Sequence, residues 1–183
     1  MHKLIKMDDS SFLKIKKEYD GFYRSLLRNG RLPMWGTNKG FWNASISGEV
    51  YASFKKINLH EFNKFLDIGS GDGKVALIAS LFCQRAEGIE IDSFLHNKAV
   101  EMQMKLGINN AGFHNKDFFE HDFSKYDALF ISPDAPLERG LEKKLLGEMN
   151  GKLIHYGLHF QPKFLKKENS FLVNGTLVSL YSR

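Results

Sequence analysis

The segment best suited to ligand binding is a glycine-rich run with acids at positions 67 and 72, Asp67-Ile68-Gly69-Ser70-Gly71-Asp72-Gly73. An apolar, strand-like pair, Phe65-Leu66, precedes it, and a helical pattern from Lys74 to Phe82 follows it. A glycine loop between a strand and a helix lets a ligand contact the backbone, because no Cβ stands in the way. The two carboxylates repel a phosphate and attract a positive charge. The loop therefore predicts a site for a cationic ligand.

Other functions of such a loop require residues that this chain lacks. The dinucleotide fingerprint needs a third glycine for close packing of helix on strand, and Lys74 stands at that position. A P-loop needs a first glycine where Ile68 stands, and a hydroxyl for magnesium where Val75 stands. S-adenosylmethionine fits better, since it has no phosphate and carries an ammonium and a sulfonium. A glycine turn that merely reverses the chain is the structural alternative.

A further acid lies one strand along the chain. Residues 85–92 have the pattern of a strand that ends in acids, and Glu90 stands about 20 residues after the glycine loop. An acid at this distance binds ribose in open α/β sheets, because a carboxylate accepts hydrogen bonds from both hydroxyls. An ordinary solvated strand end is the alternative. The spacing to the loop favours the ribose-binding role.

The elements that must position these acids alternate along the chain. Apolar residues recur at helical spacing between residues 9 and 28, which predicts an amphipathic helix that ends near Asn29-Gly30. Strand and helix patterns then alternate, which predicts a parallel sheet with helices on both faces. The predicted elements are a loop over 31–39, helices over 47–56, 72–82, 92–106 and 137–149, strands over 64–68, 86–91, 112–115, 126–131 and 152–158, and an Asn-Gly hairpin over 171–181.

Length and composition limit the class of protein. The 183 residues suffice for one domain with a sizeable core. No apolar run approaches the roughly 20 residues of a membrane span, and the N-terminal residues lack the apolar stretch of a signal peptide. The single cysteine, Cys83, excludes an intramolecular disulfide. These features predict a cytoplasmic protein with no membrane partner. The net charge of +5 permits a nucleic-acid partner without requiring one.

The two acidic motifs together resemble motifs I and II of the class I, Rossmann-like S-adenosylmethionine-dependent methyltransferases; they are Asp67 to Gly73 and Gly88-Ile89-Glu90-Ile91-Asp92. A narrower resemblance is to small archaeal protein-lysine methyltransferases, in Asp117-Phe118-Phe119 and in Leu153-Ile154-His155-Tyr156. The resemblance implies a Rossmann-like parallel sheet with helices on both faces that ends in an antiparallel hairpin. We expect a single domain over 1–183, with an N-terminal helical extension over 1–56 and a cofactor-binding core over 57–183.

The resemblance also implies S-adenosyl-L-methionine as the cofactor and S-adenosyl-L-homocysteine as the product. In the family, an acid at the position of Asp117 accepts from the adenine amino group, and Phe118 would add a backbone contact. Asp117 as a helix N-cap is an alternative that is compatible with this role. The residues expected to bind the cofactor are Asp67, Gly69, Ser70, Gly71, Asp72, Gly73, Glu90, Ile91, Asp117, Phe118, Ser132 and Ser45.

The acceptor end departs from a known pattern. Methyltransferases that act on the amino groups of bases often carry Asn/Asp-Pro-Pro-Tyr at the place where this chain has Ser132-Pro133-Asp134-Ala135-Pro136. Ser132 replaces the amide and no aromatic residue follows, which disfavours a base amine as acceptor. Asp134 either orients an amine nucleophile or caps the helix over 137–149.

The narrower resemblance favours a protein lysine as the acceptor. In those relatives an aromatic and a hydroxyl residue cover the cofactor and line the substrate entrance, and Trp42 and Ser45 match them. An aromatic rim holds a lysine ammonium by cation–π contact and excludes water, which favours the neutral amine. Trp42 as a core residue is the alternative. The candidate catalytic residues are Asp134, Tyr156 and Trp42.

Three other functional classes stay open. An RNA methyltransferase would use the basic residues near both ends of the chain and would bind RNA in a salt-sensitive manner. A non-catalytic S-adenosylmethionine-binding module would bind the cofactor without transferring a methyl group. An NAD-dependent oxidoreductase would bind NAD more tightly than S-adenosylmethionine. No metal site is predicted, because the histidines lack H-E-x-x-H or a similar spacing.

Overall fold

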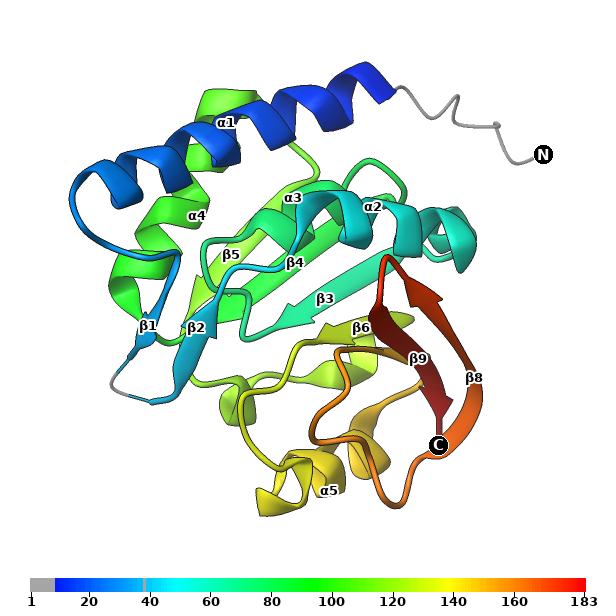
Figure 1. Ribbon diagram of the computed structural model, residues 1–183. Helices are drawn as coiled ribbons and strands as arrows, with labels where there is room; N and C mark the ends of the chain where they lie inside the picture. Colours follow the sequence, from blue (N-terminus) through cyan, green and yellow to red (C-terminus); the bar gives the residue numbers. More distant parts are fainter. Residues whose placement is uncertain (1–8, 38) are drawn as a thin grey trace.

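Seven strands form one mixed sheet at the centre of the computed structural model, which describes residues 9–37 and 39–183 (Figure 1). The order across the sheet is β5-β4-β3-β6-β7-β9-β8; the strands from β3 to β7 are parallel, and β9 is antiparallel to both neighbours. The chain moves outward from β3 to β5 and then returns to β6, so the order reverses beside β3, which is where open α/β sheets bind ligands. The strands are β3 (Lys64–Ile68), β4 (Arg85–Glu90), β5 (Ala111–Asn115), β6 (Ala128–Ile131), β7 (Lys152–Tyr156), β8 (Lys166–Val173) and β9 (Thr176–Ser182).

Helices cover both faces of this sheet. The first four helices lie on one face, and α5 lies on the other (Figure 1). Each face has its own apolar core, one around Phe54, Phe65 and Phe82 and the other around Leu66 and Leu145. Among the described residues no helix is both long and apolar enough to cross a membrane. The helices are α1 (Asp9–Arg28), α2 (Ser47–Lys56), α3 (Lys74–Ala79), α4 (Ser93–Leu106) and α5 (Leu141–Glu148), with 3-10 turns η1 (Leu59–Glu61), η2 (Phe118–Glu120), η3 (Phe123–Lys125) and η4 (Leu137–Arg139).

The sheet and its closing hairpin confirm the predicted Rossmann-like fold. Asn174 and Gly175 connect β8 to β9 with φ angles of 48° and 95°. Two positive φ angles in succession are what a two-residue hairpin turn of type I′ requires, and Asn-Gly adopts them with little strain. Helices α1 and α2 occupy the predicted ranges. The alternation of patterns was therefore a sufficient guide to the order of the strands in the main sheet.

Several predicted boundaries were wrong. The helix expected over 72–82 begins only at Lys74, because Gly73 has a left-handed φ of 80°, and it ends at Ala79. The helix expected over 137–149 is interrupted at Gly140, whose φ of 120° separates η4 from α5. The strands expected over 126–131 and 152–158 are shorter, at Ala128–Ile131 and Lys152–Tyr156.

The predicted loop over 31–39 contains a strand. Strand β1 (Met34–Gly36) pairs with β2 (Phe41–Asn43) as a small antiparallel hairpin, which places Trp35 opposite Trp42 with ring centroids 4.3 Å apart. Strands of three residues are too short to show a period in the sequence. Helix α1 and this hairpin form most of the N-terminal extension, whose residues 1–8 lie outside the described residues.

Candidate functional site

A cavity of about 470 Å³ opens at the carboxyl ends of β3, β4 and β6. Its size lies within the usual range of small-molecule sites. The glycine loop, the β1–β2 hairpin, the segment after β5 and the loop after β6 form its walls. All the residues predicted to bind a cofactor line this cavity, with the exception of Gly73. The fold therefore brings the predicted residues together from segments far apart in the chain.

The glycines are needed at two points of the loop. Gly71 has a φ of 53°, and a Cβ there would overlap the ring of Trp42. Gly73 has a φ of 80°, and a Cβ there would overlap Ala99 of α4. The Ser70 amide donates to the carbonyl of Ile89 at 2.8 Å and so fixes the loop against β4. Any other residue at 71 or 73 would strain the backbone and push these neighbours away.

Asp67 is a buried carboxylate that lacks a full set of partners. Its side chain lies at the end of β3, the residue is 3% exposed, and no described residue donates to Oδ2. Burial, and then the charges of Glu90 and Asp72, raise the pKa of Asp67 well above its usual range. Buried polar atoms normally have a hydrogen-bond donor. A cationic ligand in the cavity would supply one and would favour the ionised carboxylate.

Glu90 is fixed by two backbone amides. Its Oε2 accepts from the Gly71 amide and its Oε1 accepts from the Asp92 amide, each at 2.8 Å. The residue is 9% exposed, and burial raises its pKa. A carboxylate oxygen accepts more than one hydrogen bond, so both oxygens can also accept from a diol. Glu90 is therefore a rigid acceptor beside the loop rather than an ordinary solvated strand end.

Asp72 joins the glycine loop to the N-terminal helix. The Tyr23 hydroxyl donates to Asp72 Oδ2 at 2.6 Å, and the Tyr19 hydroxyl donates to the Asp72 carbonyl at 2.7 Å. Burial raises the pKa of Asp72, while the charge of Lys74 opposes the rise. Asp72 lines the cavity, but its carboxylate is already engaged by α1. Sequence analysis did not predict these two contacts, because Tyr23 and Tyr19 lie 49 and 53 residues before Asp72 in the chain.

Lys74 is a buried cation that sequence analysis also missed. The residue is 2% exposed, its Nζ donates to the Ser45 carbonyl, and it lies 4.6 Å from the ring centroid of Tyr23. Burial lowers the pKa of Lys74, and the charges of Asp72 and Asp20 oppose that shift. Lys74 therefore offsets the charge of Asp72, whereas Asp67 and Glu90, which also line the cavity, have no cationic partner in contact with them among the described residues.

The segment after β5 forms another wall of the cavity. The Asp117 side chain accepts from the Phe119 amide at 2.9 Å, which confirms the predicted helix N-cap at the start of η2. Phe118 and Phe119 both line the cavity, with ring centroids 4.7 Å apart. Asp117 itself lines the cavity, so its capping role is compatible with ligand contact.

The candidate catalytic residues lie in different places. Trp42 is 8% exposed, packs with Leu26 and Leu95, and also lines the cavity, so it is both a core residue and a wall of the site. The Tyr156 hydroxyl donates to Glu49 Oε2 at 2.6 Å in a buried network, and Tyr156 does not line the cavity. The structure therefore does not place Tyr156 at the site.

Asp134 does not have the capping role considered for it. The residue before η4 is Pro136, which offers no side-chain cap. Asp134 Oδ2 instead accepts from the Phe41 amide at 2.5 Å, so it ties the loop after β6 to the β1–β2 hairpin. Asp134 is exposed and lines the cavity. It therefore stands at the open end of the site.

Four more residues at this end were not predicted. Phe41 and Phe119 are exposed aromatic residues, and Lys39 and Arg139 are exposed cations; all four line the cavity. They stand on the hairpin, on η2 and on η4. Single exposed residues of these types are common, so their sequence positions carried no signal before the fold was known.

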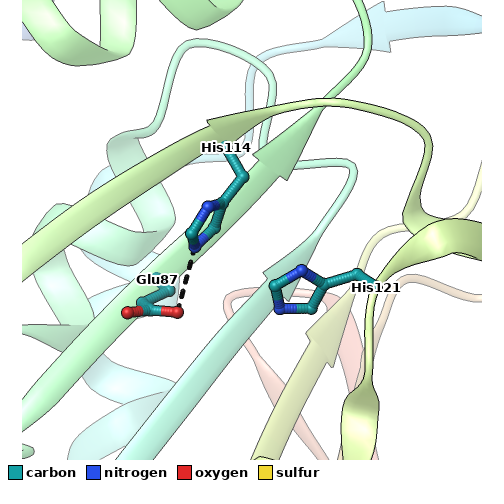
Figure 2. A group of neighbouring side chains, drawn as sticks. All are labelled: Glu87, His114 and His121. Atoms are coloured by element: carbon teal, nitrogen blue, oxygen red, sulfur yellow. Dashed lines mark hydrogen bonds and ion pairs between the residues drawn. The ribbon is translucent and has the colours of Figure 1, made fainter.

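A second group of titratable side chains lies outside the cavity: Glu87, His114 and His121 (Figure 2). Burial by itself raises the pKa of Glu87, but hydrogen bonds from Tyr126, Arg85 and His114 outweigh it and lower the pKa to about 2. Burial and the charge of Lys116 lower the pKa of His121 to about 4. At neutral pH the carboxylate is therefore ionised and the His121 imidazole is neutral. No spacing rule in the sequence indicated this grouping.

Comparison with known proteins places the fold. No protein-family model and no curated protein matches this sequence. An RNA methyltransferase from Salinibacter ruber, in complex with S-adenosyl-L-homocysteine, is 20% identical with a TM-score of 0.66, over 75% of this chain and 92% of its own. A tRNA (uracil-54, C5)-methyltransferase from Pyrococcus abyssi, also in complex with S-adenosyl-L-homocysteine, is 17% identical with a TM-score of 0.63, over 77% of this chain and 40% of its own. The chain has the Rossmann-like α/β fold seen in these methyltransferases.

Proposed function

We propose that this protein is an S-adenosylmethionine-dependent methyltransferase that methylates an amine. The observation that carries the proposal is the buried Oδ2 of Asp67, a residue that lines the cavity; no described residue donates a hydrogen bond to this oxygen. A carboxylate in that state needs a donor or a cation. S-adenosylmethionine offers both, through its ammonium and its sulfonium, and it brings no phosphate to oppose Asp67, Asp72 and Glu90.

The residues of the cavity fit the parts of this cofactor. The backbone of Gly69 to Gly71 and the Asp67 carboxylate would hold the methionine part, and Glu90 would accept from the ribose hydroxyls. Asp117 and Phe118 would hold the adenine. When bound, S-adenosylmethionine supplies an electrophilic methyl group on a positively charged sulfur. The protein itself contributes position, a negative surface for the cation, and the exclusion of water.

A protein lysine is the acceptor that we propose first. Asp134 is exposed, lines the cavity and accepts from the backbone amide of Phe41, which is itself exposed and also lines the cavity. A carboxylate held at one oxygen by a backbone amide can orient an amine through the other oxygen. An aromatic ring beside it attracts the lysine ammonium and then favours the neutral, nucleophilic amine by excluding water. In the reaction a nitrogen–carbon bond forms, the carbon–sulfur bond breaks, and the amine releases one proton.

RNA is the second candidate acceptor, and two observations favour it. Lys39 and Arg139 are exposed cations that line the same cavity, where they could contact phosphates. Phe41 and Phe119, which are 51% and 47% exposed, offer faces on which an unpaired base could stack. The two structural neighbours described above are named as RNA and tRNA methyltransferases.

Labelled-methyl transfer distinguishes these acceptors. The protein is incubated with S-adenosylmethionine that carries a labelled methyl group, together with separate protein and RNA fractions of a cell extract. We expect label in methyl-lysine that is released by protease; label released only by ribonuclease would support RNA instead. Glu90→Ala should lose transfer to either fraction, whereas Glu120→Ala, an exposed acid outside the cavity, should keep it. Cofactor binding without labelling of any fraction would reduce the protein to a binding module.

A further inference from the structure

We propose that Glu87, His114 and His121 bind one divalent cation of the zinc class, at a site separate from the cavity. The three residues come from β4, from β5 and from the segment after η2. One ligand atom from each lies within 4.8 Å of the other two. Figure 2 shows the two imidazole rings and the carboxylate gathered around one point from these three segments. The inference goes beyond the proposed function and does not depend on it.

The ligand set suits zinc. Two imidazoles and one carboxylate, with a further position for water, form a common zinc coordination, with bonds of about 2.0–2.2 Å. Two ligands at that distance from one tetrahedral ion are roughly 3–3.5 Å apart. Glu87 Oε2 and His114 Nε2 are already 3.1 Å apart. A small movement of the His121 ring would complete the set.

Neighbouring side chains hold the carboxylate in a suitable orientation. The Arg85 guanidinium donates to Glu87 Oε1 at 2.9 Å, so Oε2 faces the two histidines. The Tyr126 hydroxyl donates to the same Oε2 and lies 2.8 Å from His121 Nε2. Such outer contacts orient metal ligands and tune their affinity. Tyr126 thus bridges Glu87 and His121 in the metal-free protein, and His121 Nε2 would exchange this hydrogen bond for the ion.

The protonation of the imidazoles must change when an ion binds. The single proton of the Tyr126 hydroxyl is donated to Glu87, so His121 Nε2 carries a proton toward Tyr126, and His114 Nε2 carries one toward Glu87. A metal takes the lone pair of a deprotonated ring nitrogen. Each imidazole can supply that lone pair at Nε2 once the proton there has moved to Nδ1 or has left to solvent, so any proton that the site loses goes to water.

An ion can reach this point from the solvent. The His114 side chain is 37% exposed and the Glu87 side chain is 18% exposed, whereas His121 is 7% exposed. The ion would therefore enter past His114 and meet His121 on the inner side. His121 follows directly after η2, which carries Phe118 and Phe119 of the cavity wall. A bound ion would therefore link η2, through His121, to strands β4 and β5 of the sheet.

The test is a titration of tag-free, chelator-treated protein with Zn²⁺, and with Co²⁺ as a spectroscopic probe. We expect one equivalent of either ion to bind, with a visible Co²⁺ absorption of the intensity typical of four or five ligands, and we expect no comparable binding of Mg²⁺, which prefers oxygen ligands. His114→Ala and Glu87→Gln should each weaken binding by at least about tenfold. His159→Ala, an exposed histidine outside the group, is the matched control.

Two results would overturn the proposal. One is the absence of stoichiometric Zn²⁺ and Co²⁺ binding by the folded wild-type protein. The other is binding that His114→Ala and Glu87→Gln leave unchanged, since the ion would then lie elsewhere. His114 is partly exposed, so its loss should leave the fold intact, which circular dichroism of the metal-free variant verifies. Neither result bears on cofactor binding, which is measured separately with S-adenosylhomocysteine.

Discussion

Two carboxylates on adjacent strands of one sheet, those of Asp67 and Glu87, differ in the hydrogen-bond donors that surround them. Asp67 lies one residue before the end of β3 and lines the cavity, and no described residue donates to its Oδ2. Glu87 lies in the middle of β4 and receives hydrogen bonds from Arg85, Tyr126 and His114. The pKa of Asp67 is raised by burial, whereas the pKa of Glu87 is lowered to about 2 despite its burial.

Hydrogen-bond partners, rather than burial, distinguish the carboxylate at the ligand site from the structural carboxylate. At Glu87 the fold itself supplies the donors that an ionised carboxylate needs, so the group stabilises the native state. At Asp67 the fold supplies no such donor to the buried Oδ2, and this lowers the stability of the native state. Proteins retain a destabilising group of this kind where a ligand supplies the missing donor. Removal of each carboxylate should therefore have opposite effects on stability.

The largest expected effect is that of Asp67→Asn on ligand binding. Loss of a charge-assisted contact should weaken S-adenosylhomocysteine binding by roughly 10- to 100-fold. The same change should raise the melting temperature of the ligand-free protein at neutral pH, by about 2–4 °C for each kcal/mol gained. Calorimetric titration and a thermal melt measure the two effects. Glu61→Gln, at an exposed acid in η1 that does not line the cavity, is the matched control and should change neither. A destabilised Asp67→Asn protein would contradict the comparison.

Glu87→Gln should act in the opposite direction. The amide cannot accept as strongly from Arg85, Tyr126 and His114, so the free energy of unfolding should fall by about 1.5–3 kcal/mol at neutral pH. Binding of S-adenosylhomocysteine should change little, because Glu87 does not line the cavity. Urea denaturation of the metal-free protein measures the loss. An unchanged midpoint would mean that these hydrogen bonds contribute nothing net.

The loss of unfolding free energy in Glu87→Gln should depend on pH, in the opposite sense to the effect of Asp67→Asn. Folding lowers the pKa of Glu87 from an ordinary value of 4.5 to about 2. Its contribution to stability is therefore fully present above about pH 4.5 and is lost as the pH falls toward 2. The difference in unfolding free energy between wild type and Glu87→Gln should shrink over this window. For Asp67 the folded pKa is raised, so its contribution is present at low pH and is lost as the pH rises. Denaturation curves at several pH values measure both trends, and a parallel pH response of the two variants would contradict them.

The smallest expected effect concerns the attachment of α1 to the loop. Tyr23→Phe removes the hydroxyl that donates to Asp72 Oδ2, which should cost about 1 kcal/mol of unfolding free energy. Weaker attachment of α1 should also lower cofactor affinity a few-fold, because Asp72 lies in the same loop. Tyr51→Phe is the control, since its hydroxyl donates to Asp9 at the start of α1, so it removes a contact of the same helix that does not involve the glycine loop. Equal losses from both variants would show that the Asp72 contact has no special role.

The sequence predicted the site where the signal was local. The acidic glycine loop and Glu90 follow strands, and parallel strands bring their carboxyl ends together, so order along the chain was enough to place them. Asp117 was found for the same reason. The N-cap role of Asp117 also depends on a residue only two positions away.

The contacts that sequence analysis missed join distant segments. Tyr23 and Asp72 are 49 residues apart in the chain, and a tyrosine and an aspartate at this separation give no sequence pattern that predicts a contact. Glu87 and His114 are 27 residues apart on different strands, and their grouping depends on the register of β4 against β5. Gly140 interrupts the predicted helix over 137–149 through a positive φ that its helical neighbours gave no reason to expect. Asp134 bonds to the hairpin rather than capping that helix, because β2 lies beside it in space.

Isothermal titration calorimetry with S-adenosylhomocysteine decides whether the acidic cavity binds S-adenosylmethionine. We expect one-to-one binding in the micromolar range by the wild-type protein, a much weaker affinity for Glu90→Ala, and no comparable binding of NAD. If the folded protein does not bind S-adenosylhomocysteine, or binds NAD more tightly, the cavity is not a site for S-adenosylmethionine.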